Sequence, residues 1–143
     1  MFVYVKINKN YAISKKKYFQ IGNIIFHVEP YVNSGIKISI HNNEIRHNSK
    51  SRYEEHFYDR TSTHITIGRS ENCNIKIKNS ILSKIQCTLY YEDSTQNWFI
   101  KDGNGERHSM NGTWVLCNSN MISEEETKCK IGKSIIKIKK ILV

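Results

Sequence analysis

The fold is decided by residues 63–100, which read THITIGRSENCNIKIKNSILSKIQCTLYYEDSTQNWFI. Apolar side chains occupy every second position in four short runs, namely Ile65/Ile67, Ile75/Ile77, Cys87/Leu89/Tyr91 and Trp98/Ile100. This alternation is typical of strands with one buried face, because successive side chains of a strand point to opposite faces. Turn-forming residues separate the runs, at Gly68, Asn79-Ser80 and Asp93-Ser94-Thr95. The stretch therefore predicts several short strands joined by turns.

The same period continues on both sides of this stretch. Upstream, Ile36, Ile38 and Ile40 share one face, and two earlier strands are expected at 2–7 and 19–28, the second interrupted at Gly22-Asn23. Downstream, further strands are expected at 113–116 and around 136–138. No stretch has a long helical period, so the pattern predicts an all-β sandwich or barrel.

Two regions need a separate interpretation. We expect residues 1–35 to form an N-terminal extension, a β-hairpin that packs on the main domain at 36–143 and covers a sheet edge. Residues 42–62 are polar, and a loop of that length is uncommon inside a compact domain. We expect a loop there that contains one short helix at 52–60.

Composition bounds the class of protein. The chain has 143 residues, of which 38% are hydrophobic and 24% charged, which suits one globular domain. Its 22 Lys and Arg against 13 Asp and Glu give a formal charge of +9, which favours anionic partners. We see no signal peptide and no apolar run near the ~20 residues that cross a bilayer. We therefore expect a soluble intracellular protein, in the nucleus or cytoplasm, without a membrane partner.

Catalytic and metal-binding patterns are missing from the sequence. The four cysteines (Cys73, Cys87, Cys117, Cys129) form no C-x-x-C pair, and the six histidines show no metal-ligand spacing. Cys87 and Cys129 lie in strand-like runs and are expected to be core residues. Neither G-x-S-x-G nor a P-loop occurs. We expect no enzyme activity, no cofactor and no metal.

Three short polar signatures occur at strand ends: Ile67-Gly68-Arg69-Ser70, Ser83-Lys84-Ile85-Gln86 and Met110-Asn111-Gly112-Thr113-Trp114. Their residue types suit a phosphate group. Arg69 offers a planar fork of N–H donors, Ser83 a hydroxyl and Lys84 a cation. Asn111 can donate to and accept from a peptide main chain, and Gly112 permits the tight turn that would expose it.

The order and spacing of these signatures resemble a forkhead-associated (FHA) domain over residues 36–138. That family has a Gly-Arg after its second strand, then Ser-x-x-His, then Asn-Gly followed by Thr and an aromatic residue. The resemblance implies an eleven-stranded antiparallel β-sandwich, here with an extra N-terminal β segment. It also implies a module that reads phosphothreonine in an extended peptide, so that the partner would be a phosphothreonine-containing protein.

The family's site residues carry over by position. Arg69 and Ser83 would hold the phosphate, Lys84 would add to that contact, and Asn111 would bond the peptide main chain. Ile81 falls where the family reads the third residue after the phosphothreonine. Gly68, Gln86 and Gly112 would support the loops.

Two positions depart from the family pattern. Gln86 stands where the family has His, a brace for the loops, and the amide can still donate and accept. Met110 stands where the family usually has a Thr or Ser hydroxyl near the phosphate, which lowers the expected affinity. His108 and Ser109 are the nearest polar residues that could compensate.

Two alternatives stay open. Met110 and Gln86 motivate a phosphate-independent scaffold with the same fold. The charge of +9 motivates a basic nucleic-acid-binding domain, although the lysines are scattered and no aromatic RNA-binding signature is present. Such modules often belong to larger multidomain proteins, and this chain is compatible with being part of one.

Overall fold

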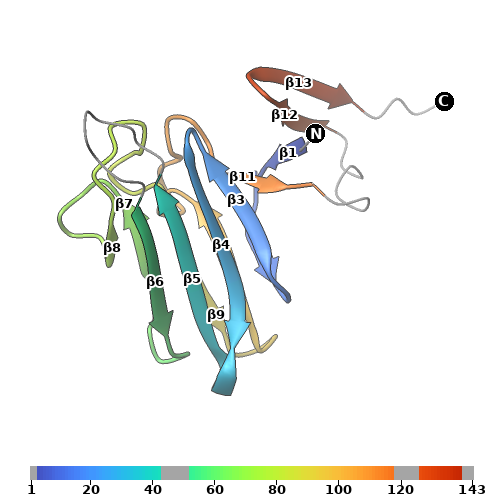
Figure 1. Ribbon diagram of the computed structural model, residues 1–143. Coiled ribbons are helices and arrows are strands. Elements are labelled where there is room, and N and C mark those ends of the chain that lie inside the picture. The colour runs from blue at the N-terminus through green and yellow to red at the C-terminus, as the bar shows by residue number, and fades with distance from the viewer. Residues whose placement is uncertain (1–2, 43–51, 118–125, 140–143) are drawn as a thin grey trace.

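The computed structural model describes residues 3–42, 52–117 and 126–139, and these form two β-sheets without an α-helix (Figure 1). The larger sheet contains β1 (Val3–Lys6), β3 (Lys17–Ile21), β4 (Ile24–Tyr31), β5 (Gly35–Asn42), β6 (Arg52–Tyr58), β11 (Trp114–Leu116), β12 (Glu126–Ile131) and β13 (Ser134–Lys139). The smaller sheet contains β2 (Tyr11–Ile13), β7 (Ile65–Gly68), β8 (Ile75–Lys76), β9 (Cys87–Glu92) and β10 (Asn97–Asp102). A single 3₁₀ turn (Val32–Ser34) joins β4 to β5.

The strand orders are β13-β12-β1-β11-β3-β4-β5-β6 and β2-β10-β9-β7-β8. This arrangement confirms the predicted all-β fold with two sheets. Thirteen strands lie in the described residues, against the eleven that the resemblance implied. The sandwich is also not purely antiparallel, because β7 and β8 pair in parallel, with Ile67 opposite Ile75.

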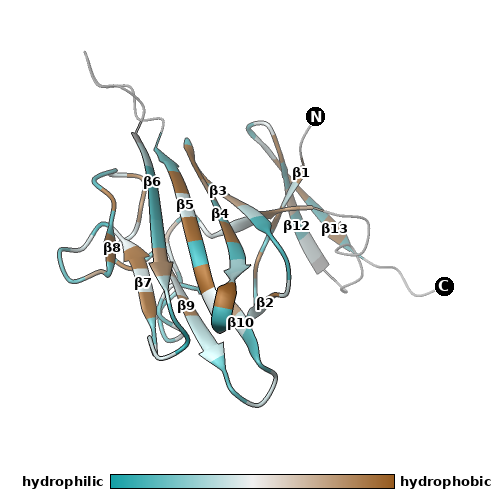
Figure 2. Cartoon of the chain, turned by 60° about the horizontal axis from the view of Figure 1, so that its bottom comes forward, coloured by the Kyte–Doolittle hydropathy of each residue, from teal (hydrophilic) through white to brown (hydrophobic). Residues whose placement is uncertain are grey.

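The core lies between the two sheets and follows the period of two in the sequence. The inward faces of β4 and β5 bury Ile24, Phe26, Val28, Ile36, Ile38 and Ile40, and bands of apolar and polar residues alternate along these strands in Figure 2. The rings of Phe19 and Phe26 stack with centroids 5.1 Å apart. Cys87 and Cys129 are buried and unpaired, as small core residues.

Residues 1–35, expected to form an N-terminal extension with a β-hairpin packed on the domain, contain the antiparallel pair β3 and β4. β3 and β4 are indeed joined by a tight turn at Gly22, but β4 pairs along its whole length with β5, across the expected boundary at residue 35. β1 lies between β11 and β12. β1, β3 and β4 are interior strands of the larger sheet, since each pairs on both sides, and their buried apolar residues belong to the common core.

Two further expectations need correction. The short helix expected at 52–60 is instead β6, an edge strand that pairs with β5 from Ile36↔Tyr58 to Asn42↔Arg52. The rest of the long polar loop expected at 42–62 falls largely on residues 43–51, outside the described residues. The alternation around 136–138 does mark a strand, β13, but Ile135, Ile136 and Ile138 are exposed, because this strand pairs only at the outer edge of the sheet.

Candidate functional site

Three loops that begin or end at strands of the smaller sheet come together through their main chains: residues 69–74 after β7, residues 77–86 before β9, and residues 103–113 between β10 and β11. The Arg69 N–H donates to the Ser83 carbonyl oxygen (3.0 Å), and the Ser70 N–H donates to that of Lys84 (3.1 Å). The Gly103 N–H donates to the Gln86 carbonyl oxygen (2.8 Å). The loops that carry the three sequence signatures are therefore neighbours.

Gly68 allows the first two loops to approach each other. A Cβ atom at this position would overlap the carbonyl oxygen of Lys84 and would lie 3.0 Å from the Gln86 nitrogen. The neighbouring atoms are backbone and cannot move aside as a flexible side chain could. Close packing of the backbone therefore requires a glycine at position 68. From the sequence, Gly68 was predicted only to support the loops in a general way.

The cations of the site are Arg69 and Lys84, both exposed. The Nε of Arg69 donates to the Leu82 carbonyl oxygen (3.1 Å), which fixes the base of its guanidinium group. Neither side chain forms an ion pair within the described residues. Lys76, by contrast, pairs with Glu71, and the hydrogen bond from this lysine lowers the pKa of the Glu71 carboxyl. Arg69 and Lys84 thus remain available to an external anion.

Ser83, Met110 and Asn111 connect the second and third loops. The Ser83 hydroxyl oxygen accepts from the Met110 N–H (2.9 Å), and the Asn111 side-chain amide donates to the Ile81 carbonyl oxygen (3.0 Å). The Trp114 indole N–H donates to the Asn111 carbonyl oxygen (2.9 Å) and holds the turn from the other side. The Ile81 side chain is half-buried, and Met110 is 90% exposed.

Gln86 is fully buried beneath these loops. Its amide oxygen accepts from the Ser83 N–H (3.0 Å). Its amide nitrogen donates to the Gly112 carbonyl oxygen (3.0 Å) and to the Thr113 hydroxyl oxygen (3.3 Å). The Gln86 side chain therefore links the second and third loops through both its donor and its acceptor groups.

A second buried network supports the third loop, and the sequence reasoning missed it. Asp102 accepts from the Ser109 N–H (2.9 Å), the Ser109 hydroxyl (2.6 Å) and the Thr113 hydroxyl (2.8 Å). The Ser109 hydroxyl oxygen in turn accepts from the Gly112 N–H (2.9 Å). Ser109 thus braces the loop from inside and is not positioned to replace the hydroxyl missing at Met110. The sequence offered one indication that Ser109 belongs to this loop, namely its position two residues before Asn111.

Two thiols lie at these loops: Cys73 is within the first loop and donates to the Lys84 carbonyl oxygen (3.2 Å), and Cys87 directly follows the second loop. Cys87 is fully buried, and burial raises the pKa of its thiol, with the nearby Asp102 carboxylate adding to the rise. A protonated buried thiol is a poor nucleophile. In the part of the chain that the structure describes, no three His, Cys, Asp or Glu side chains gather in a way that could hold a metal ion. Nor do the same residues include any helix long and apolar enough to span a membrane.

The chain matches a known protein family over the region that contains these loops. The family model described as FHA domain matches residues 65–137, from β7 into β13. This range is half of the chain and contains all three loops. No curated protein and no solved structure matches the chain.

Proposed function

The chain belongs to the FHA domain family, whose members are protein-interaction modules that bind phosphopeptides, and we propose that it binds a phosphothreonine-containing segment of a partner protein. The proposed site consists of Arg69, Ser83, Lys84 and Asn111. One observation carries the proposal: Arg69 and Lys84, neither of which has an ion-pair partner in the described residues, lie on two loops that hydrogen-bond to each other, and the second of these loops bonds to Asn111 on the third. We expect the partner to meet this protein in the nucleus or cytoplasm.

Each residue has a chemical role in this proposal. The guanidinium of Arg69 offers its terminal N–H groups to phosphate oxygens, since its Nε is already bonded to Leu82. Ser83 has used its oxygen as an acceptor for Met110, so its hydroxyl proton can be donated to the phosphate. The Asn111 side-chain amide donates one proton to the Ile81 carbonyl oxygen and keeps its side-chain oxygen for a peptide N–H.

The test is a degenerate phosphothreonine peptide library screened against the wild type and Arg69→Ala. A charge-assisted hydrogen bond contributes about 1.5–3 kcal/mol, so we expect Arg69→Ala to lose roughly tenfold to a hundredfold in affinity. Arg60→Ala, an exposed arginine in the turn after β6, is the matched control and should bind as the wild type does. Equal enrichment by Arg69→Ala and the wild type would refute the proposed site.

A phosphate-independent scaffold is the second candidate, favoured by one observation. Met110 is 90% exposed at the position where the family places a hydroxyl. The same peptides with unmodified threonine separate the two functions. We expect them not to bind, whereas affinity equal to that of the phosphorylated peptides would establish the scaffold.

A further inference from the structure

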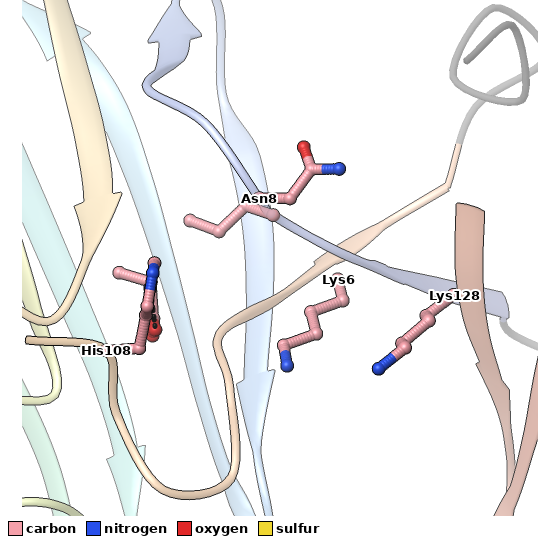
Figure 3. Close-up of a pocket in the computed structure, with 6 residues that line it drawn as sticks. Lys6, Asn8, His108 and Lys128 are labelled. Atoms are coloured by element: carbon pink, nitrogen blue, oxygen red, sulfur yellow. Dashed lines mark ion pairs between the residues drawn. The ribbon is translucent and has the colours of Figure 1, made fainter. Parts of the chain in front are cut away.

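A pocket of about 430 Å³ lies next to the candidate site and is not used by it (Figure 3). It is lined by Lys6, Ile7, Asn8, Asp102, His108 and Lys128. These residues come from β1 and the segment that follows it, the end of β10, the loop 103–113, and β12. Residues from the N-terminal and C-terminal parts of the chain therefore line the pocket together, beside the third loop of the site.

The pocket concentrates positive charge. The amino groups of Lys6 and Lys128 extend into the same space (Figure 3). The register that sets Val5 opposite Cys129 makes these two lysines neighbours on adjacent strands. Neither forms an ion pair within the described residues, and adjacent like charges across a strand pair destabilise a sheet. An anion bound between them would relieve this repulsion.

The carboxylate in the pocket wall does not oppose such an anion strongly. The Asp102 side chain is only 6% exposed. Its oxygens already accept three hydrogen bonds, from the Ser109 N–H and from the hydroxyls of Ser109 and Thr113. The His108 Nδ1 atom lies 3.6 Å from Asp102 Oδ2 while its side chain is 82% exposed. When protonated, this ring adds a third cation at the rim.

The pocket and the candidate site share one loop. A Cβ on Gly112 would lie 2.7 Å from Lys6 Cε, so the stem of Lys6 packs directly against the Asn111-Gly112 turn. The loop that presents Asn111 to the proposed site presents His108 to the pocket. The pocket and the proposed site therefore lie on the same loop.

We propose that this pocket binds a second anionic group, a phosphoryl or carboxylate group, on the same phosphothreonine-containing segment. The inference rests on the proposed function for the ligand itself. The pocket extends recognition from one phosphate to a pair of anionic groups at a fixed spacing. It selects segments with acidic residues or a second phosphorylation site near the phosphothreonine.

The test uses three peptide series built on one phosphothreonine. The first carries alanine at the flanking positions, the second a glutamate moved through them, and the third a second phosphothreonine at the same positions. We expect one position to raise affinity by about tenfold, with the larger gain showing whether a carboxylate or a phosphoryl group is preferred.

The variant Lys6→Met with Lys128→Met removes both charges and keeps the apolar stems. We expect it to lose the gain from the second anion while its affinity for the singly phosphorylated peptide stays as in the wild type. Lys16→Met, an exposed lysine outside the pocket, is the matched control and should keep the gain. A singly phosphorylated peptide that binds, with no gain at any position, would overturn the inference and leave the proposed function intact.

Inorganic phosphate tests the pocket without any peptide. We expect a saturable shift of the His108 ring resonances that persists in Arg69→Ala and disappears in the double lysine variant. If no phosphothreonine peptide binds at all, the proposed function fails, and this titration still decides whether the pocket is an anion site. A shift that is unchanged in the double variant would exclude Lys6 and Lys128 as its cause.

Discussion

Gln86 is the residue on which the geometry of the candidate site most depends. It is fully buried, and its amide group makes hydrogen bonds to Ser83, Gly112 and Thr113. Ser83 is itself a proposed contact residue, and Gly112 is the next residue in the chain after Asn111, which is another. A change at Gln86 therefore acts on the proposed phosphate-binding and peptide-binding groups together, without itself being a proposed contact.

We expect Gln86→Leu to lower the free energy of unfolding by about 1–3 kcal/mol, because it leaves buried polar groups without partners. Urea denaturation measures this loss. Gln20→Leu is the matched control, since Gln20 is half-buried and donates one hydrogen bond, to the Gly22 carbonyl oxygen. Gln86→His, the family's residue, should fall between the two. Equal losses for Gln86→Leu and Gln20→Leu would contradict a bracing role.

At this scale the sequence predicts the exposed half of the candidate site. Gly68-Arg69, Ser83 and Asn111-Gly112 are recognisable because each signature is local in the chain, and the structure brings them together. The network of Asp102, Ser109 and Thr113 was not predictable, because it depends on how the loop 103–113 closes on itself. A buried polar residue in a loop has the same sequence signal as an exposed one.

The strands β3 to β6 form an element with a distinct outer face. Tyr18, His27, His41 and Tyr53 lie one on each strand, with successive ring centroids 5.4, 6.4 and 4.6 Å apart. Lys37 on β5 bridges Glu29 (3.8 Å) and Glu55 (3.3 Å) on the two flanking strands. Aromatic contacts and ion pairs thus link the strands on the side away from the core.

One residue on this outer face, His27 on β4, makes the stability of the protein depend on pH. Burial lowers the pKa of His27 below its ordinary value of 6.5, and the nearby Lys16 lowers it further. The unfolded chain then takes up this proton at a higher pH than the folded protein does. Protonation favours unfolding, so the free energy of unfolding falls as the pH drops below about 6.5.

We expect the difference in urea midpoint between about pH 7 and about pH 5.5 to be smaller in His27→Gln than in the wild type. Gln keeps the polar side chain but cannot take up the proton. Titration of the His27 ring by NMR gives an independent readout of the lowered pKa. An equal pH dependence in both proteins would show that His27 does not contribute.

Strand identity was predictable where one face is apolar, as on β5 and β7. It failed on β6, where Tyr53, Glu54, Glu55 and His56 are polar and compatible with a helix. Pairing with β5 decides the outcome there, because strand preference depends on neighbours more than on the residue itself. The sequence also did not predict that the isoleucines of β13 are exposed. Alternation indicates that a strand has an apolar and a polar face, but not that another element covers the apolar one.

At the scale of the whole molecule, β1 joins two parts of the larger sheet. It pairs with β11 on one side and with β12 on the other. In the described residues, β12 and β13 reach the rest of the sandwich only through this strand, and they project from its edge in Figure 1. Sequence alternation predicted that β1 is a strand but could not identify its neighbours, which lie near the other end of the chain.

We expect Val5→Pro to loosen the β12–β13 hairpin, because proline cannot donate a hydrogen bond to the sheet. Val5 is buried and faces Val115 and Cys129 on the two neighbouring strands. Hydrogen exchange of the β12 and β13 amides should accelerate by about tenfold or more. Val5→Ala keeps the backbone N–H and is the control for lost packing. Equal acceleration in both variants would show that the backbone pairing of β1 is not what holds the hairpin.

The position of β1 also governs when folding can finish during synthesis. The ribosome makes β1 (Val3–Lys6) long before its partners β11 (Trp114–Leu116) and β12 (Glu126–Ile131). At about 5–20 residues per second, the nascent apolar strand stays without either neighbour for roughly 5 to 20 seconds. Chaperones that bind short apolar segments have that interval in which to act. Premature release from the ribosome would leave an unpaired strand and a sheet that cannot close.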